Sequence, residues 1–439
     1  MSFRTECGKI GFFWELSVFF LKGLKMENVI TADIAVIGGG AAGLTAAIEA
    51  KQSAPALNVV IAERLDRTGK KILVTGSGRC NLTNRNISGG DYHGSLPFVM
   101  DIIKKTKNTE EFFRSLGVLC TADEEGRVYP YSKSAASVLS ALRLKIKSLD
   151  IPEICGFKAE KIDKIKNGFT VSAEDGRIIK CRRIIAACGG YASPANGTDG
   201  AALKMFREMG VKTAKICPAV APLRVDPAFV KGLKGVRVHG RVSAVSGDKV
   251  LKTEEGEIQF TENSISGICV FDLAYLFSEY EGKLSVKADL MPEYSEKQLT
   301  DILKDIKTTR NDCTLEEFLN GLFVKNLAVF IMKKSLELPL TELVSSLNDK
   351  DLSKIAVKIK NLVFKITGCS SWQNAQVTSG GIHAGEIDDS LCLKKEKGIF
   401  FAGEILDTDG KCGGYNLEWA WSSGMWAGSN CALSLLNLT

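Results

Sequence analysis

Continuous apolar runs and helical periodicity alternate along the first part of the chain. The stretch "DIAVIGGGAAGLTAAIEA" (33–50) has the pattern of a buried strand, a glycine turn and a helix, and "NVVIAE" (58–63) has that of a second buried strand. Two strands joined by a helix form a parallel unit of an α/β sheet. The pattern therefore predicts a Rossmann-like beginning.

The stretch "FKAEKIDKIKNGFTVSAEDGRIIKCRRIIAACGG" (157–190) has a different pattern. Its short alternating runs are separated by Asn167-Gly168 and Asp175-Gly176, dipeptides that favour tight turns. We expect a three-stranded meander whose last strand, "RIIAACGG", stops at paired glycines.

The periodicity changes twice more beyond residue 210. Short alternating runs such as "GRVSAVS" and "EIQFT", between about 211 and 290, predict an antiparallel barrel or sheet. The next stretch, up to about residue 364, has apolar positions at helical spacing. Ser295 with Gln298, and Thr314 with Glu317, match capping boxes at helix starts.

The first glycine turn carries a nucleotide-binding pattern, because Gly38, Gly40 and Gly43 match G-x-G-x-x-G. The first glycine makes the tight turn, the second lets the backbone approach a pyrophosphate, and the third permits close helix–strand packing. Glu63 ends the second strand 20 residues after Gly43, where an acid binds ribose hydroxyls and repels a 2′-phosphate. The alternative is a structural turn. The context favours an adenine dinucleotide and disfavours NADP at this place.

A third segment, "GIFFAGEILDTDGKCGGYNLEWAWSSGMWAG" (398–428), favours FAD over NAD. Flavoproteins place an acid after such a strand, here Glu404, to bind ribitol hydroxyls, and aim the next helix at the pyrimidine edge of the flavin. Gly413 and Gly414 lie between strand and helix, where cofactor contact is expected. The helix tryptophans are interpreted as core packing: Trp419, Trp421 and Trp426.

Four stretches resemble one family: "GKKILVTGSGRCNLTN", "FTENSISG", "ITGCSSWQNAQVTSGGI" and "FAGEILDTDGKCGGYNLEWAWSSG". They are similar to the BaiN-like (YhiN-type) NAD(P)/FAD-dependent oxidoreductase flavoproteins, over nearly everything from about Ile30 onward. In "FTENSISGI" (260–268) the chain departs from the family, with Glu262, Ser264 and Ile268 where the family has His, Gly and Pro. The role of that histidine is therefore not carried over.

The resemblance and the patterns together imply an α/β fold. We predict a Rossmann-like FAD-binding domain of the two-dinucleotide-binding type, with an inserted β-barrel plus helical domain. The expected division is an N-terminal extension (1–29), the first segment of the FAD-binding domain (30–195), the inserted β-barrel domain (196–294), the helical portion of the insert (295–365) and the second segment of the FAD-binding domain (366–439).

The run 74–84, "VTGSGRCNLTN", raises the question of what Cys80 does. A redox-active thiol would want a partner two or three residues away, and none is present, so a packing or hydrogen-bonding role is expected. The resemblance implies that the run 69–84 lies along the flavin, with Lys70, Lys71, Gly78, Arg79, Cys80 and Asn81 as contacts. With the motifs, the full set of cofactor-binding candidates is Gly38, Gly40, Ala41, Ala42, Gly43, Glu63, Arg64, Lys70, Lys71, Gly78, Arg79, Cys80, Asn81, Ala187, Gly189, Gly403, Glu404, Asp407, Gly414, Tyr415, Asn416 and Leu417.

No catalytic acid or base stands out near the expected flavin. Tyr191, Asp407 and Tyr415 are the candidates for proton delivery, together with Glu404 and Asp409; each is as compatible with a structural role. There is no second G-x-G-x-x-G, so NADH or NADPH would dock transiently in the cleft between the FAD domain and the insert. A reduced partner protein is the alternative donor.

Composition excludes some functions. The net charge of +6 is spread along the chain, which argues against a nucleic-acid partner, and the 13 cysteines are scattered without a C-x-x-C, as in a reduced, cytoplasmic protein. The three histidines (His93, His239 and His383) lack metal-ligand spacing, so no metal is expected.

The leader "MSFRTECGKIGFFWELSVFFLKGLK" is expected to be an extension outside the fold. Its apolar run contains Glu15 and is too short to span a bilayer, so no membrane partner is expected, although a peripheral anchor is an alternative. The oligomeric state cannot be read from the sequence.

The sequence therefore predicts an FAD-dependent oxidoreductase, more a reductase than an oxidase. We expect hydride transfer through flavin N5 between a nicotinamide donor and a small-to-medium hydrophobic organic molecule. The resemblance implies reduction of a conjugated C=C bond, as in oxidised bile acids. One alternative is a flavin amine oxidase that uses O₂, resembling aminoacetone oxidase. The other is a non-catalytic FAD-bearing partner or RNA-associated module.

Overall fold

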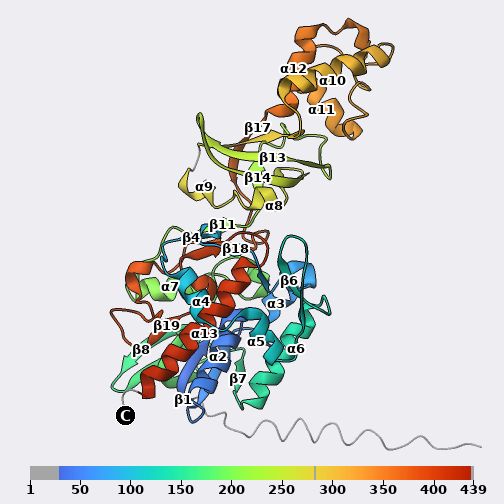
Figure 1. The fold of residues 1–439 in the computed structure, drawn as a ribbon. Coiled ribbons are helices and arrows are strands. Elements are labelled where there is room, and N and C mark those ends of the chain that lie inside the picture. Colours follow the sequence, from blue (N-terminus) through green and yellow to red (C-terminus); the bar gives the residue numbers. More distant parts are fainter. Residues whose placement is uncertain (1–28, 281–282, 437–439) are drawn as a thin grey trace, which may run out of the picture.

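The computed structural model describes residues 29–280 and 283–436 (Figure 1). The expected N-terminal extension thus lies outside the described residues, except for Val29. In Figure 1 a Rossmann-like α/β region, a barrel and a group of helices follow one another along the molecule.

A seven-stranded sheet forms the centre of the α/β region. β1 (Val29–Ile37) lies between β2 (Val59–Glu63) and β10 (Ile178–Ala186) and runs parallel to both. β7 (Glu153–Cys155) extends the sheet beyond β2, and β19 (Ile399–Phe401) pairs in parallel with β10. The continuous apolar runs predicted β1, β2, β10 and β19, because both faces of a parallel sheet are covered, whereas the short β7 was not predicted.

The predicted meander is confirmed. β8 (Ala159–Ile165), β9 (Gly168–Ala173) and β10 are antiparallel neighbours. β9 pairs with residues 178–181 of β10, and β19 pairs with residues 184–186 farther along the same strand. The meander and the last sheet strand therefore share one edge of β10.

Two helices from opposite ends of the chain pack together on this sheet. α2 (Ala41–Ser53) and α13 (Tyr415–Leu436) lie side by side (Figure 1). A Cβ on Gly424 would lie 2.5 Å from the carbonyl oxygen of Ala42. Glycine is thus what allows α13 to approach the backbone of α2 so closely.

The other elements of the α/β region surround the sheet. They are α3 (Lys70–Val74), β3 (Thr83–Asn84), β4 (Tyr92–Gly94), α4 (Val99–Lys105), α5 (Thr109–Ser115), β5 (Cys120–Ala122), β6 (Arg127–Pro130), α6 (Ala135–Ser148), α7 (Ala201–Glu208) and β20 (Thr408–Gly410).

The insert contains a closed barrel, as expected. Its strands in barrel order are β12 (Leu223–Val225), β15 (Ser264–Ser266), β14 (Lys249–Phe260), β13 (Arg237–Ser246), β16 (Leu284–Asp289) and β17 (Leu362–Cys369). β17 follows the helices in sequence, so the helical portion is itself inserted into the barrel. The barrel and these helices share one hydrophobic core, distinct from the core of the α/β region.

Three longer helices form the far end of the insert: α10 (Glu296–Thr309), α11 (Lys325–Ser335) and α12 (Asp349–Lys360). The capping box of Ser295 and Gln298 is confirmed. The helix expected after Thr314 is wrong, although its hydroxyl does donate to Glu317. The N–H groups of the next two residues bond to carbonyls of residues 340 and 342 instead, so the segment forms turns.

The α/β region and the insert are joined by two adjacent chain crossings. β11 (Cys217–Ala219) and β18 (Val377–Ser379) pair antiparallel at this junction. Two short helices of the insert, α8 (Ile268–Phe271) and α9 (Leu276–Glu279), lie on the barrel side nearest the α/β region (Figure 1).

Candidate active site

A cavity of about 720 Å³ runs along the carboxyl ends of β1, β10 and β19 and reaches the insert. Parallel sheets bind ligands at this edge. The wall is formed by the β1–α2 turn, the segment after β2, α3 and the turn after it, the loop before α13, and residues from the junction with the insert.

The three glycines of the first turn differ in what surrounds them. Gly38 has φ +102°, and a Cβ there would lie 2.4 Å from the Ala187 oxygen. A Cβ on Gly43 would lie 1.8 Å from the Gly38 oxygen, whereas one on Gly40 would meet nothing within 4 Å. Gly43 therefore serves helix packing, and Gly40 leaves the cavity open where a pyrophosphate would approach.

The start of α2 is open to an anion. Its N-cap is Gly40, no side chain caps it, and its first turn has no acidic residue. The unpaired N–H groups and the positive end of the helix dipole thus remain available for a phosphate. This arrangement fits the dinucleotide that the glycine pattern predicts.

Glu63 is fixed at the end of β2. Its two carboxylate oxygens accept hydrogen bonds from the N–H groups of Gly39 and Leu65, each at 2.8 Å. Next to it, Arg64 forms an ion pair of 2.5 Å with Asp199. Each Glu63 oxygen keeps one lone pair free, which is what a ribose hydroxyl requires.

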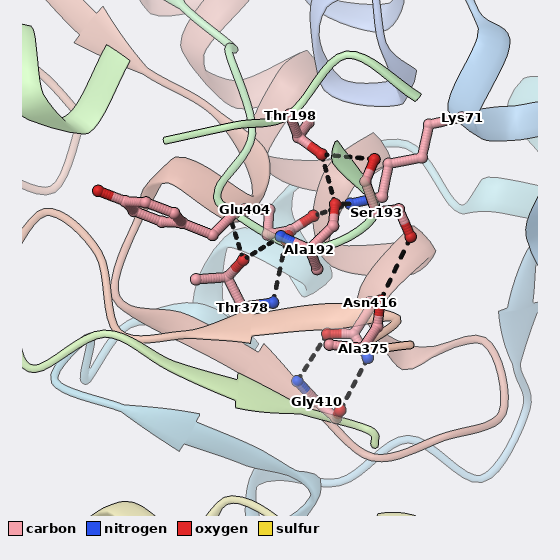
Figure 2. Close-up of polar contacts among 10 residues, drawn as sticks. Lys71, Ala192, Ser193, Thr198, Ala375, Thr378, Glu404, Gly410 and Asn416 are labelled. Atoms are coloured by element: carbon pink, nitrogen blue, oxygen red, sulfur yellow. Dashed lines mark hydrogen bonds and ion pairs between the residues drawn. The ribbon is translucent and has the colours of Figure 1, made fainter. Parts of the chain in front are cut away.

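Glu404 takes part in a network that joins three distant segments (Figure 2). Its carboxylate pairs with Lys71 at 2.6 Å and accepts the N–H of Thr378 at 3.0 Å. Lys71 also donates to the Ala192 oxygen. This network ties α3 and the β18 junction to the turn after β19, and each carboxylate oxygen retains a lone pair, which a ribitol hydroxyl would require.

The loop before α13 is also built around glycine. Gly413 and Gly414 have φ of +120° and +105°, and a Cβ on Gly414 would lie 2.4 Å from the Thr83 oxygen. The Asn416 side chain bonds both the N–H and the carbonyl of Gly410 (Figure 2). These two hydrogen bonds fix the loop 410–416 at the start of α13. Gly414, Asn416 and Leu417 are in the cavity wall.

Most predicted cofactor residues line this cavity. They are Gly38, Gly40, Ala41, Ala42, Glu63, Arg64, Lys70, Lys71, Arg79, Asn81, Ala187, Gly189, Gly403, Glu404, Gly414, Asn416 and Leu417. Five predicted residues are not in its wall: Gly43, Gly78, Cys80, Asp407 and Tyr415.

The position of Cys80 follows from its backbone. Ser77 and Cys80 have positive φ, so the run turns sharply, and the Cys80 side chain is fully buried in the core of the α/β region. Burial raises the pKa of the Cys80 thiol to about 12, so the thiol stays protonated near neutral pH. Both findings fit a packing residue.

We expect Cys80→Ala to retain FAD and most of the turnover, because the thiol neither lines the cavity nor ionises. Alanine replaces cysteine at the same positive φ, so the backbone cost is unchanged. The measurement is the flavin-to-protein absorbance ratio together with steady-state turnover. A variant that binds FAD fully but has no turnover would show that the thiol takes part in the chemistry.

Of the five candidates for proton delivery, Glu404 lines the cavity, whereas Tyr191, Asp407, Asp409 and Tyr415 do not. The Tyr191 ring packs against Trp372, with centroids 5.2 Å apart. Asp407 is buried and accepts the N–H of Ser95, and burial raises its pKa. Tyr415 is buried beside Tyr92, edge to face. Tyr191, Asp407 and Tyr415 all have structural contacts, so the acid must be sought elsewhere.

The tryptophan interpretation holds for one residue and needs refinement for two. Trp421 is fully buried and donates to the Leu82 oxygen. Trp426 is only partly buried, and its N–H donates to the Asp389 oxygen. Trp419 is buried but also contributes to the cavity wall.

The sequence reasoning missed the walls contributed by the insert and by β6. These residues are Arg127, Tyr129, Val220, Ile268, Phe271 and residues 373–377. Two signals were present, since Ile268 closes the stretch that departs from the family and residues 373–377 lie in "ITGCSSWQNAQVTSGGI". No pattern near β6 indicated Tyr129, because its place depends on the packing of β6.

Asp272 lies at the end of α8, on the insert side of the junction. It accepts the N–H of Cys412 at 2.7 Å, across the boundary between the insert and the α/β region. Burial raises the pKa of this carboxyl to about 6, Glu254 adds to the increase, and Lys252 and Lys411 oppose it. Its ionisation is therefore costly in the folded protein.

This raised pKa predicts that Asp272→Asn stabilises the folded protein, by an amount that depends on pH. Unfolded Asp ionises at about pH 4, so the wild type loses stability as the pH rises from about 4 to 6, by about 3 kcal/mol for a shift of about two units. Asparagine keeps an acceptor for Cys412 without the charge. We expect the variant to be more stable by about 3 kcal/mol at pH 8 and by about half of that at pH 5. Denaturant midpoints at both pH values test this, and an equal difference at both would contradict it.

Neither a membrane-spanning helix nor a metal cluster occurs among the described residues. Of the described helices, none combines the length and apolar character needed to cross a bilayer. Within residues 29–280 and 283–436, no group of three or more His, Cys, Asp or Glu is placed to hold a metal ion.

Comparison with known proteins agrees with this geometry. The family described as "HI0933-like protein Rossmann domain" matches residues 32–430. A 3-dehydro-bile acid delta(4,6)-reductase from Clostridium scindens is 37% identical over 409 residues, which cover 91% of this chain and 98% of that protein. A ribosomal RNA dihydrouridine synthase from Haemophilus influenzae is 26% identical, covering 93% of this chain and 98% of that protein.

One solved structure shows the likeness of fold. A quinol–fumarate reductase from E. coli has a TM-score of 0.50 and 18% identity, covering 94% of this chain and 71% of that chain. At this identity the likeness concerns the architecture alone.

Proposed function

The chain belongs to the family of HI0933-like proteins with a Rossmann domain, and from this premise we propose that it reduces a conjugated carbon–carbon double bond in a hydrophobic organic molecule. It is an FAD-dependent oxidoreductase, as its relatives indicate. The substrate class, the donor and the residue roles that follow belong to our proposal.

The observation that carries the proposal is the two-sided wall of the cavity. One side has the glycine turn, the open start of α2 and the carboxylates suited to a dinucleotide. The other side, contributed by the insert, presents the apolar residues Val220, Ile268 and Phe271. A flat apolar molecule fits between such a wall and a flavin ring.

FAD supplies a ring that accepts and donates a hydride. In our proposal Glu63 holds the adenosine ribose, the start of α2 the pyrophosphate, and Glu404 the ribitol chain. The start of α13 would stabilise negative charge on the pyrimidine edge of the ring. Lys71 positions Glu404 through their ion pair.

The donor in this proposal is NADH or NADPH. The chain has a single G-x-G-x-x-G, so the nicotinamide would bind transiently, in the cleft between the α/β region and the insert. A cytoplasmic location accords with a soluble hydride donor and remains a prediction.

A second candidate substrate is a uracil ring in ribosomal RNA. The name of the H. influenzae relative describes a dihydrouridine synthase, and its match extends over 98% of that protein. The uracil C=C bond is conjugated to a carbonyl, so the chemistry would be of the same kind. The greater identity with the bile-acid reductase favours a small-molecule substrate.

Anaerobic stopped-flow spectroscopy of the purified holoenzyme tests these alternatives. We expect the visible flavin absorbance to bleach on mixing with NADH or NADPH, and to recover on adding a 3-oxo-4,6-diene bile acid. Recovery with an unmodified ribosomal RNA fragment, but not with the dienone, would favour the second candidate. Bleaching by an amine, followed by recovery with O₂, would favour an amine oxidase. A protein that neither contains nor binds FAD would refute all of them.

A further inference from the structure

Reduction of a conjugated double bond needs a proton as well as a hydride. The hydride adds to one carbon, and an acid must protonate the other. Which side chain in the cavity wall supplies that proton is a question that rests on the proposed function.

The carboxylates of the wall are already occupied as acceptors. Glu63 accepts two backbone N–H groups, and Glu404 accepts Lys71 and the N–H of Thr378. Asp199 pairs with Arg64, which helps to hold its pKa below the ordinary value, although burial opposes this. Acceptors held in this way have no proton to give.

The thiols of the wall are poorly placed for donation. The Cys188 thiol already donates to the Ile37 oxygen. Burial raises the pKa of Cys412 to about 12, and the neighbouring Asp272 carboxylate adds to the increase. Losing a proton beside a carboxylate is unfavourable, so Cys412 is a poor acid.

Tyr129 has the opposite surroundings. It lies on β6 in the cavity wall, with the Arg79 guanidinium 5.0 Å and the Lys133 ammonium 4.9 Å from its ring centroid. Burial raises the pKa of its hydroxyl and Asp123 and Cys412 add to the rise, so the phenol holds its proton at neutral pH, while Arg127 and Arg79 counter the rise. These cations stabilise the phenolate that remains after donation.

The Tyr129 hydroxyl is also free to act. Among the described residues no group forms a hydrogen bond with this hydroxyl. Its oxygen is nevertheless not one of the polar atoms that are fully buried without a partner. The hydroxyl oxygen is therefore not sealed in the protein interior, and Tyr129 is part of the cavity wall. Cys412 is one of its electrostatic neighbours, and Cys412 bonds Asp272 of the insert. Tyr129 and Cys412 both line the cavity, so Tyr129 shares the wall with a residue at the junction between the α/β region and the insert.

We propose that Tyr129 is the catalytic acid of the double-bond reduction. A hydride, which bound FAD would supply from the nicotinamide donor, would add to the β-carbon of the enone, and the π-electron pair would shift towards the carbonyl. The O–H bond of Tyr129 breaks as the α-carbon takes its proton. The phenolate then regains a proton from water in the open cavity, so two electrons and two hydrogens are added in all.

The test is Tyr129→Phe in the holoenzyme, which keeps the ring and its contacts with Arg79 and Lys133. We expect unchanged FAD content and unchanged anaerobic bleaching by the nicotinamide donor. Reoxidation by a 3-oxo-4,6-diene bile acid should slow at least about 100-fold, while reoxidation by O₂ stays the same.

Binding provides a separate readout. The dissociation constant of the dienone from the oxidised holoenzyme, followed by the change in the flavin spectrum, should weaken by no more than about tenfold, since a single neutral hydrogen bond is lost. Tyr131→Phe is the matched control, because Tyr131 lies two residues farther along, is 75% exposed and does not line the cavity. It should behave like the wild type.

The outcomes separate the two proposals. If Tyr129→Phe is reoxidised by the dienone as fast as the wild type, Tyr129 is not the acid and the proposed function stands. If the dienone fails to reoxidise the reduced wild type, the proposed function fails, and the role of Tyr129 fails with it. A slow variant with lost FAD or slow bleaching would show a structural role instead.

Discussion

Gly40→Val is expected to abolish FAD binding while leaving the apoprotein folded. A Cβ at this position meets nothing within 4 Å, so the protein itself has room for the side chain. Gly40 has φ −82° in the extended region, which a β-branched residue adopts readily. The added methyl groups would occupy the space in front of α2 where the pyrophosphate must approach. We expect FAD affinity to fall at least about 100-fold, which is about 3 kcal/mol.

The measurements are the FAD dissociation constant by titration and the unfolding midpoint of the apoprotein. The free energy of unfolding derived from that midpoint should change by no more than about 1 kcal/mol, the cost of replacing a glycine N-cap. Gly90→Val is the matched control, since Gly90 is exposed, lies outside the cavity wall, and a Cβ there would come no closer than 4.0 Å to a neighbour, the Ser88 hydroxyl. A Gly40→Val protein that purifies with a full complement of FAD would contradict the assignment of this turn.

A side chain at Gly43 should also be harmful, but for a different reason. A Cβ on Gly43 would lie 1.8 Å from the Gly38 oxygen, so a side chain there forces α2 away from the turn. Both glycines belong to the same sequence pattern, and the surroundings of each agree with the role that the pattern predicts, the approach of a ligand at Gly40 and the packing of the helix at Gly43.

Local patterns predicted the features of the site that local chemistry determines. Gly38, Gly40 and Glu63 lie within one strand–helix–strand unit, so their spacing along the chain is enough to place them together. The meander and the barrel were likewise visible as alternation and turn dipeptides. The closure of the barrel by β17 was not, because β17 follows three helices that are themselves inserted.

Contacts between distant segments were beyond the reach of these patterns. Lys71 and Glu404 are 333 residues apart, and only the folded sheet brings them to 2.6 Å. The resemblance placed Gly78 and Cys80 at the cofactor as a continuous run. The positive φ of Ser77 and Cys80 bends that run, so Arg79 and Asn81 line the cavity whereas Gly78 and Cys80 do not.

Trp421→Ala is expected to lower the free energy of unfolding by about 3–5 kcal/mol, as for other large aromatic residues removed from a core. The Trp421 side chain, on α13, is fully buried and packs edge to face against Phe113, with ring centroids 5.0 Å apart. Its N–H donates to the Leu82 oxygen at 3.0 Å, so alanine also leaves that carbonyl without this donor.

The loss should extend to the cofactor, because Leu82 directly follows Asn81 in the cavity wall. Trp426→Ala is the matched control on the same helix, since Trp426 is only partly buried and bonds an oxygen near the surface. We expect it to cost less than half as much and to leave FAD binding intact. Denaturant unfolding of the apoproteins and FAD titration measure both effects. Equal losses of stability and FAD affinity in the two variants would contradict this expectation. They would show that Trp421 does not specifically hold the run 79–84 against α13, and that α13 tolerates the loss of Trp421 as readily as that of Trp426.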